Sequence, residues 1–384
     1  MPTRWTDLPT VPTVSLPGRP LLEGWLAFTD DARHLLVHSV DGWLQVWDVQ
    51  RRELAYEYDG HFVLGAAPGP NTEHLTAFAP DRIVVLEHRG RSWAVREYPH
   101  SFPTPGDDPY GPYVWVRSMA VGPDETVVAT RRWVASVSTA DPARVLGFHR
   151  LVAADVDAAA LCVRRSAYRH YVSIAYDDFR SVGMNNPEEP AVRFITQHTD
   201  GRVIGDLTLD GRVARFCHWL YDHTATAVLP LSGRQFAAVF HGPEGAFEIR
   251  TLEAARGKGR FWATESGHAV IGLAAGRVSR WTRSDRMPTT VAVPGSGPVV
   301  ARPSHEGERC MLLSYALENP PRGVAVDLER GRVIGQCTGH AAGLTPYTFS
   351  PGGRLFATVV TANTETDFPG HCKNGTVVIS ELGT

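Results

Sequence analysis

One turn pattern recurs along this chain, and it limits the fold more than any other feature of the sequence. In each copy an apolar strand end is followed by Pro, Gly, Asp, Asn or Ser residues and then by a new apolar strand. Such residues supply the backbone angles and the local hydrogen bonds that a tight reversal requires. Because no long stretch shows a clear helical period, the pattern predicts many short strands and an all-β fold. The copies are 28–35, 67–75, 121–128, 229–236, 302–310 and 349–356.

Two further repeats indicate the size of the repeating unit. The string GRVIG occurs at 201–205 and again at 331–335, which are 130 residues apart, or three units of about 43 residues. Asp48 precedes His61 by 13 residues, and Asp327 precedes His340 by the same interval. This period is typical of one blade of a β-propeller, in which small four-stranded sheets are arranged radially.

The repeats resemble those of the WD-repeat family. The best match is 25–61, which carries an Asp-Gly turn and a Trp-Asp pair, and 337–382 is similar, with Ser380 at the position of the family's tryptophan. In the second unit Glu87 takes that position. The resemblance implies that the inner Trp, His and Asp side chains hydrogen-bond within a blade and are structural. These residues are Asp41, Trp47, Asp48, His61, Asp327 and His340.

The number of blades follows from the intervals between the turns. Two long intervals each leave room for one degenerate blade, near 155–209 and near 261–293, which gives eight blades. Seven is the commoner number in the family and stays open as the alternative. We therefore predict that 1–384 is one WD-type β-propeller domain of four-stranded antiparallel blades, and that the blades occupy 25–382.

The N-terminal segment, 1–20, is expected to close this propeller. The last unit supplies only three clear strands, and Thr10–Leu16 can add the fourth. Closure has a physical reason, because an open ring would leave unpaired edge strands that invite aggregation.

Charge and cysteine content narrow the partners and the compartment. The formal net charge is −3 and no basic stripe occurs, which disfavours binding to nucleic acid through its phosphates. Five cysteines without a CxxC pair predict a reducing, cytoplasmic environment. No apolar run approaches the ~20 residues that span a membrane, so no membrane association is expected.

Motifs for catalysis or metal binding are weak in this sequence. In 293–298 (VPGSGP) a proline stands where the nucleophile-elbow motif has its first glycine. In 217–223 (CHWLYDH) the adjacent Cys and His would point to opposite faces of a strand. The His-Cys pair at 371–372 lacks a second pair of ligands. We therefore predict no catalytic residue, no metal site and no cofactor.

Three long loops, 99–114, 177–190 and 361–375, are the best candidates for a binding surface. The resemblance implies that all three leave the same face of the propeller. Their aromatic and soft apolar side chains are of the kinds enriched at interface hot spots, although they could instead pack locally on the propeller. The candidate contact residues are Phe102, Tyr110, Tyr113, Phe179, Met184, Phe368 and His371.

These features predict a non-catalytic scaffold or sensor module that presents its loop-rich face to a protein or peptide partner. The alternative is a propeller enzyme or small-molecule binder, lactonase-like or carbohydrate-directed, that uses the central channel. Convergent histidines and carboxylates with shifted pKa values at one mouth of the channel would favour the enzyme. Exposed aromatic loops would favour the scaffold. A third option, a structural subunit of a larger assembly, predicts a large apolar patch on the side or the bottom.

Overall fold

In a computed structural model the chain consists almost entirely of β-strands. The described residues contain no α-helix; a 3-10 turn lies at Pro351–Gly353, and Asp7 also has 3-10 conformation. The structure describes residues 7–17, 24–39, 42–60, 62–69, 74–90, 92–102, 116, 118–130, 133–150, 158–165, 170–177, 192–209, 228–230, 236–241, 246–252, 260–264, 266–285, 287–294, 299–314, 322–338, 346–361 and 375–383.

Four antiparallel sheets make up the first half of the fold, each with four strands that pair in chain order. The first sheet contains β2 (Gly24–Phe28), β3 (His34–Ser39), β4 (Leu44–Asp48) and β5 (Glu53–Tyr58). The second contains β6 (Gly65–Pro68), β7 (His74–Phe78), β8 (Arg82–Arg89) and β9 (Ser92–Pro99). The third contains β10 (Ser118–Val121), β11 (Glu125–Ala129), β12 (Trp133–Ser138) and β13 (Val145–Arg150). The fourth contains β14 (Ala158–Arg165), β15 (His170–Asp177), β16 (Val192–His198) and β17 (Val203–Leu209).

Four more antiparallel sheets follow, and the first of them has three described strands. The fifth sheet contains β18 (Val228–Pro230), β19 (Phe236–His241) and β20 (Phe247–Thr251). The sixth contains β21 (Arg260–Ala263), β22 (Ala269–Ala274), β23 (Arg277–Thr282) and β24 (Thr289–Ala292). The seventh contains β25 (Val299–Pro303), β26 (Arg309–Ser314), β27 (Arg322–Asp327) and β28 (Arg332–Thr338). The eighth contains β29 (Tyr347–Phe349), β30 (Leu355–Thr361), β31 (Gly375–Glu381) and β1 (Thr13–Ser15).

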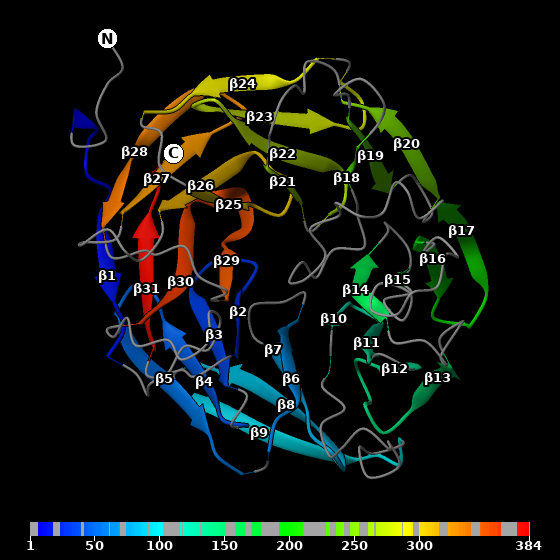
Figure 1. The fold of residues 1–384 in the computed structure, drawn as a ribbon. Coiled ribbons are helices and arrows are strands. Elements are labelled where there is room, and N and C mark those ends of the chain that lie inside the picture. The colour runs from blue at the N-terminus through cyan, green and yellow to red at the C-terminus, as the bar shows by residue number, and fades with distance from the viewer. Residues whose placement is uncertain are drawn as a thin grey trace, which may run out of the picture.

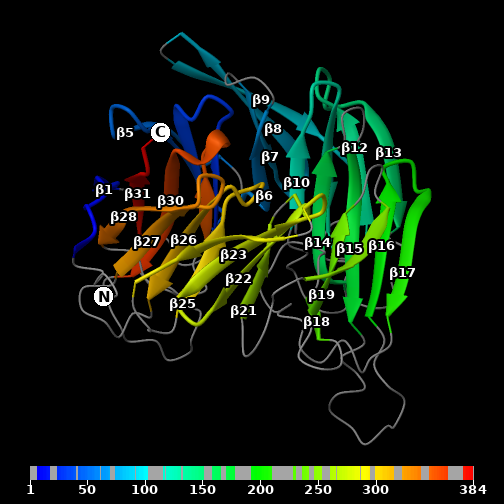
Figure 2. The ribbon, with the colours of Figure 1, turned by 90° about the horizontal axis from the view of Figure 1, so that it is seen from above.

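The eight sheets follow one another around a common centre in chain order, as Figure 1 shows. The first strand of each sheet lies nearest the centre and the last lies at the periphery. The eighth sheet contacts the first through β29 and β2. The two degenerate units predicted near 155–209 and 261–293 are the fourth and the sixth sheets, so the described residues form eight sheets, the number predicted, and not seven. In Figure 2 the hairpin of β8 and β9 reaches beyond its neighbours.

The N-terminal strand completes the eighth sheet, as the sequence predicted. β1 pairs antiparallel with β31, with Thr13 opposite Ser380 and their hydroxyl oxygens 2.8 Å apart. The preceding residues also hold the seventh sheet, because the backbone N–H of Val11 donates to the carbonyl of Gln336 at 2.7 Å. The N–H of Gln336 donates in turn to the carbonyl of Pro9 at 2.8 Å. The N-terminal segment therefore ties two neighbouring sheets together.

The turn between the first two strands has the same geometry in four sheets that are neighbours around the ring. A hydroxyl oxygen at its first position accepts the backbone N–H five residues later, at 2.9 to 3.1 Å. These hydroxyl residues are Thr29, Thr264, Ser304 and Ser350. The fourth position has a positive φ in every copy, which disfavours a side chain with a Cβ. It is occupied by Ala32 (φ 58°), Gly267 (71°), Gly307 (71°) and Gly353 (67°).

Replacing Ala32 with glycine is expected to stabilise the protein. A residue with a Cβ in the left-handed region lowers the stability of the folded state by roughly 1–2 kcal/mol. Glycine avoids this cost but lowers the stability by roughly 0.5–1 kcal/mol, because it raises the entropy of the unfolded chain. We expect Ala32→Gly to raise the free energy of unfolding in urea by roughly 0.5–1 kcal/mol. The reverse change, Gly307→Ala, should lower it, because the new Cβ would also lie 2.7 Å from Cγ2 of Thr264. A lower stability of Ala32→Gly than of the unaltered chain would contradict this strain.

The hydrophobic core is divided into layers between neighbouring sheets. Between the eighth and the first sheet, Leu26, Leu35 and Trp47 pack against Val359 and Ile379. Similar clusters join the first sheet to the second, the second to the third, the fifth to the sixth, the sixth to the seventh and the seventh to the eighth. At these six junctions neighbouring sheets therefore stabilise one another through buried apolar side chains.

The strand register corrects one assignment made from the sequence. Glu87 pairs with His74 just as Asp48 pairs with His34, so Glu87 lies at the Asp position of its sheet. The preceding residue, Leu86, is fully buried and occupies the tryptophan position. The prediction that Glu87 replaces the tryptophan is wrong, because the shorter turn of this sheet shifts the count by one residue.

Candidate interaction surfaces

Of the residues predicted to form a contact face on the three loops, the structure describes only Phe102. This ring is 7% exposed and packs against Phe78, Trp133 and Phe148, with ring centroids 5.8 to 6.3 Å apart. For Phe102 the structure therefore shows the local packing that the sequence left open, because the ring fills the layer between the second and third sheets. The other six, which lie outside the described residues, are Tyr110, Tyr113, Phe179, Met184, Phe368 and His371.

Three of the residues that the sequence resemblance predicted to be structural lie in the described part of the chain, and they make two kinds of contact. Trp47 is 3% exposed, and its Nε1–H donates to Oε1 of Gln45 at 3.2 Å. Asp48 and Asp327 instead cap turns, each accepting the backbone N–H three residues later at 2.9 Å. A carboxylate at this place satisfies a backbone donor that the turn leaves unpaired. The remaining three, Asp41, His61 and His340, lie outside the described residues.

A second tryptophan at the position of Trp47 escaped the sequence analysis. Trp281 pairs with Val270 on β22 as Trp47 pairs with Leu35 on β3, and it is 5% exposed. The hydroxyl of the next residue, Thr282, accepts the backbone N–H three residues later at 3.1 Å, as Asp48 does. In the sequence this position is marked by a Trp-Thr pair 17 residues after Thr264. Because threonine replaces the aspartate, the pair does not match the Trp-Asp motif.

Exposed apolar side chains concentrate on the outermost described strands of five consecutive sheets. β5, β9, β13, β17 and β20 each carry at least one large apolar side chain that is 37% to 51% exposed. A contiguous exposed apolar surface marks interaction sites, whereas single exposed apolar side chains are normal on a protein surface. We call this set the apolar wall; it consists of Leu54, Val95, Val145, Leu146, Phe148, Val203 and Ile249.

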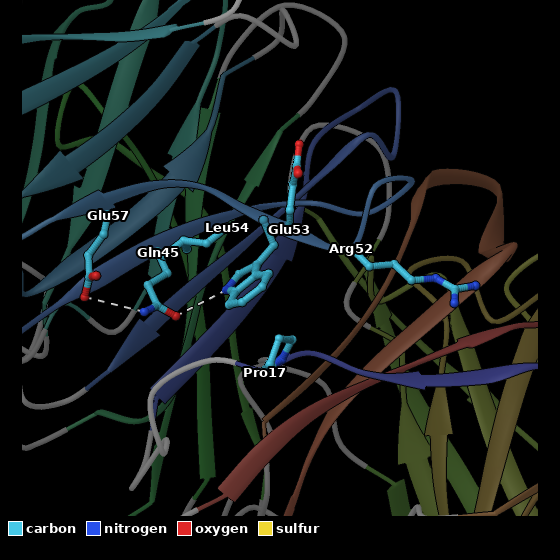
Figure 3. A pocket seen from close by; sticks show the side chains of 7 residues that line it. Pro17, Gln45, Arg52, Glu53, Leu54 and Glu57 are labelled. Atoms are coloured by element: carbon cyan, nitrogen blue, oxygen red, sulfur yellow. Dashed lines mark hydrogen bonds between the residues drawn. The ribbon is translucent and has the colours of Figure 1, made fainter.

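A groove of about 460 Å³ lies beside β5, next to the end of β1 (Figure 3). Trp47 and Gln45 are buried at its floor, and Nε2 of Gln45 donates to Oε1 of Glu57 at 3.5 Å. In Figure 3 the side chain of Arg52 extends away from this floor. The groove therefore has a buried floor and is lined by the charged residues Arg52, Glu53 and Glu57. Leu54, which belongs to the apolar wall, also lines it.

Two clusters of histidines lie at junctions between sheets. At the sixth and seventh sheets, His268 and His305 flank Glu306, with N···O distances of 3.5 and 3.7 Å. Hydrogen bonding from His268 is the main reason why the pKa of Glu306 is lowered to about 2. At the first and second sheets the rings of His34 and His88 are 5.3 Å apart, and burial lowers the pKa of His34. Both clusters connect one sheet to the next.

The described residues contain neither a metal-binding cluster nor a membrane-spanning helix. No group of three or more His, Cys, Asp or Glu side chains there is placed to hold a metal ion. No described helix has the length and the hydropathy to cross a membrane.

Comparison with known proteins gives a similarity of fold. No family model matches the chain, and no curated protein matches it. Among solved structures, the chain is similar to a computationally designed protein, Ika8, with a TM-score of 0.56 and 13% identity over 96% of this chain and 98% of that one. U3-55K has the same identity and coverage, with a TM-score of 0.49. At this identity the likeness to Ika8 concerns the fold alone.

Proposed function

We propose that this chain is an eight-bladed β-propeller of the WD type that acts as a non-catalytic scaffold for a protein partner. Eight small antiparallel sheets in chain order around one centre support the propeller. The contact between the eighth sheet and the first, together with β1 in the eighth, supports its closure. The repeated hydroxyl turn and the Trp-Asp pair at Trp47 and Asp48 support the WD type.

The apolar wall is the observation that carries the scaffold role. Its side chains recur on the outermost described strands of five neighbouring blades, so a partner that lies along this side of the propeller would meet an apolar side chain on each blade. Burying these side chains against a partner would stabilise the complex by about 25 cal/mol for each Å² of apolar area removed from water. The loop face predicted from the sequence would extend the contact surface at one end of these blades.

Affinity purification from the source cells tests this role. The tagged chain should recover one partner in a fixed ratio, and the complex should re-form from the two purified proteins. Deletion of 361–373 tests the loop face, and the double variant Leu54→Glu, Ile249→Glu tests the apolar wall. A variant that binds the partner at least about tenfold more weakly would assign the contact to the surface that it alters. Deletion of 361–373 is expected to leave the thermal unfolding midpoint unchanged.

Two results would overturn the proposed role. One is that no purified protein re-forms a complex with the full chain. The other is that the purified chain turns over a lactone or a glycoside, which would favour the enzyme of the alternative prediction. Ser279→Glu, at an exposed polar contact on β23, serves as a charge control that should leave the partner's affinity unchanged.

A further inference from the structure

The outer edges of these sheets differ in how they are protected from pairing with another chain. Natural edge strands are covered, kept short or carry charges, because their open N–H and C=O groups would otherwise pair with any extended segment. Here the N-terminal segment covers β28, and β1 has only three residues. On β9, Arg96 lies 3.3 Å from Glu87, and on β20 Arg250 pairs with Glu248 at 2.5 Å.

β13 has less of this protection, because its only charged residue, Arg150, stands at its end. It is the last strand of the third sheet, with six residues, and it lies at the periphery in Figure 1. Between Val145 and Phe148 it has no charged residue, and Val145, Leu146 and Phe148 are 51%, 45% and 38% exposed. The ring of Phe148 is held from inside by Trp133, with centroids 5.6 Å apart. No described strand pairs with the outer edge of β13, and at its last residue Nε2 of Gln197 donates to the carbonyl of Arg150 at 3.1 Å. Over 145–149 this edge therefore lies beside half-exposed apolar side chains.

The charges at the two ends of β13 indicate what this edge fits. Arg144 precedes the strand and Arg150 ends it; both are exposed, and neither forms an ion pair with another described residue. Six extended residues separate the two guanidinium-bearing positions by roughly 20 Å. A second copy of β13 would place arginine opposite arginine in either strand direction, and like charges facing each other destabilise a strand pair.

We propose that β13 binds an extended peptide segment of a partner protein as a fifth strand of the third sheet. The segment has an apolar, β-prone centre and a carboxylate at each end, about six residues apart. Main-chain hydrogen bonds supply the affinity, while the side chains beside the edge and the two arginines select the sequence. This inference rests on the proposed scaffold function and names the kind of partner segment that it binds.

Fluorescence anisotropy with the full chain tests this site. The probe is a labelled ten-residue peptide of alternating valine and threonine with two glutamates at each end. We expect it to bind the unaltered chain and to bind the Arg144→Glu, Arg150→Glu variant at least tenfold more weakly. A second probe, with lysines in place of the glutamates, should show the opposite preference. The acidic probe with a central proline should lose binding to the unaltered chain, because proline lacks the N–H that a strand pair needs.

The matched control is Arg277→Glu with Arg354→Glu, which makes the same change of net charge on the sixth and eighth sheets. It should bind the acidic probe like the unaltered chain. Equal binding of the acidic probe to the two charge-reversed variants, full binding of the proline peptide, or no binding to the unaltered chain would overturn the proposal. If the chain instead dimerises in light scattering and Phe148→Glu makes it monomeric, the occupant of β13 is a second copy.

The same variants separate this inference from the proposed function. If the Arg144→Glu, Arg150→Glu variant still captures the partner as the unaltered chain does while the probes do not bind, the scaffold function stands and only the assignment to β13 fails. If no partner binds at all and the acidic probe still binds β13 with the expected preference, the peptide site stands without the scaffold.

Discussion

A chain that starts at Pro17 is expected to have a free energy of unfolding roughly 3–6 kcal/mol lower than the full chain. The truncation removes β1 together with the buried side chains of Val11 and Leu16, which are 5% and 1% exposed in the full chain. Burying one such side chain contributes about 1.5–3 kcal/mol. It also leaves the outer edge of β31 open and releases the carbonyl and N–H of Gln336. Urea unfolding followed by tryptophan fluorescence measures the loss.

The control for this truncation is a chain that starts at Asp7, which retains every described contact of the N-terminal segment. It should unfold like the full chain. The open edge of β31 should also make the longer truncation associate, which light scattering would detect. If the chain starting at Pro17 unfolds at the same urea concentration as the full chain, β1 does not close the fold in solution.

Trp47→Ala is expected to lower the free energy of unfolding by roughly 3–5 kcal/mol. The indole lies between the first and the eighth sheets, packed in one cluster with Leu35 and Ile379. Alanine would leave a cavity there and would deprive Gln45, which is 2% exposed, of the N–H that it accepts. The substitution should therefore weaken the junction between the first and the eighth sheets, and thermal and urea unfolding both measure the loss of stability.

Leu54→Ala is the matched control for Trp47→Ala, because Leu54 pairs with Trp47 across β4 and β5 but is 41% exposed. Surface substitutions of this kind usually change stability by less than about 0.5 kcal/mol. A Trp47→Ala variant as stable as Leu54→Ala would contradict the core role of the indole.

Local chemistry explains which parts of the fold the sequence could predict. The hydroxyl turns at Thr29, Ser304 and Ser350 are formed within six residues, so their sequence pattern is sufficient to identify them. The turn at Thr264 has the same hydrogen bond, but its neighbours, Glu265 and Ser266, lack the Pro and Asp typical of the other copies. It was therefore recognised only as space for a further blade.

Burial at the surface could not be predicted in the same way. Phe102 and Phe148 are both aromatic residues near strand ends, yet the first is buried and the second is 38% exposed. Their difference depends on Trp133 and Phe78, which come from other strands and fill one side of the layer between two sheets. No local pattern contains this information.

The sequence by itself determined the all-β class, the unit of about 43 residues, the eight units and the closing strand, because turn residues and strand periodicity act over a few neighbouring residues. Only the tertiary structure decided which side chains are exposed on the peripheral strands, and that the edge of β13 carries apolar residues between two arginines without ion pairs to other described residues. The physical reason is that exposure and edge protection depend on the neighbouring sheets, whose residues are distant in the sequence.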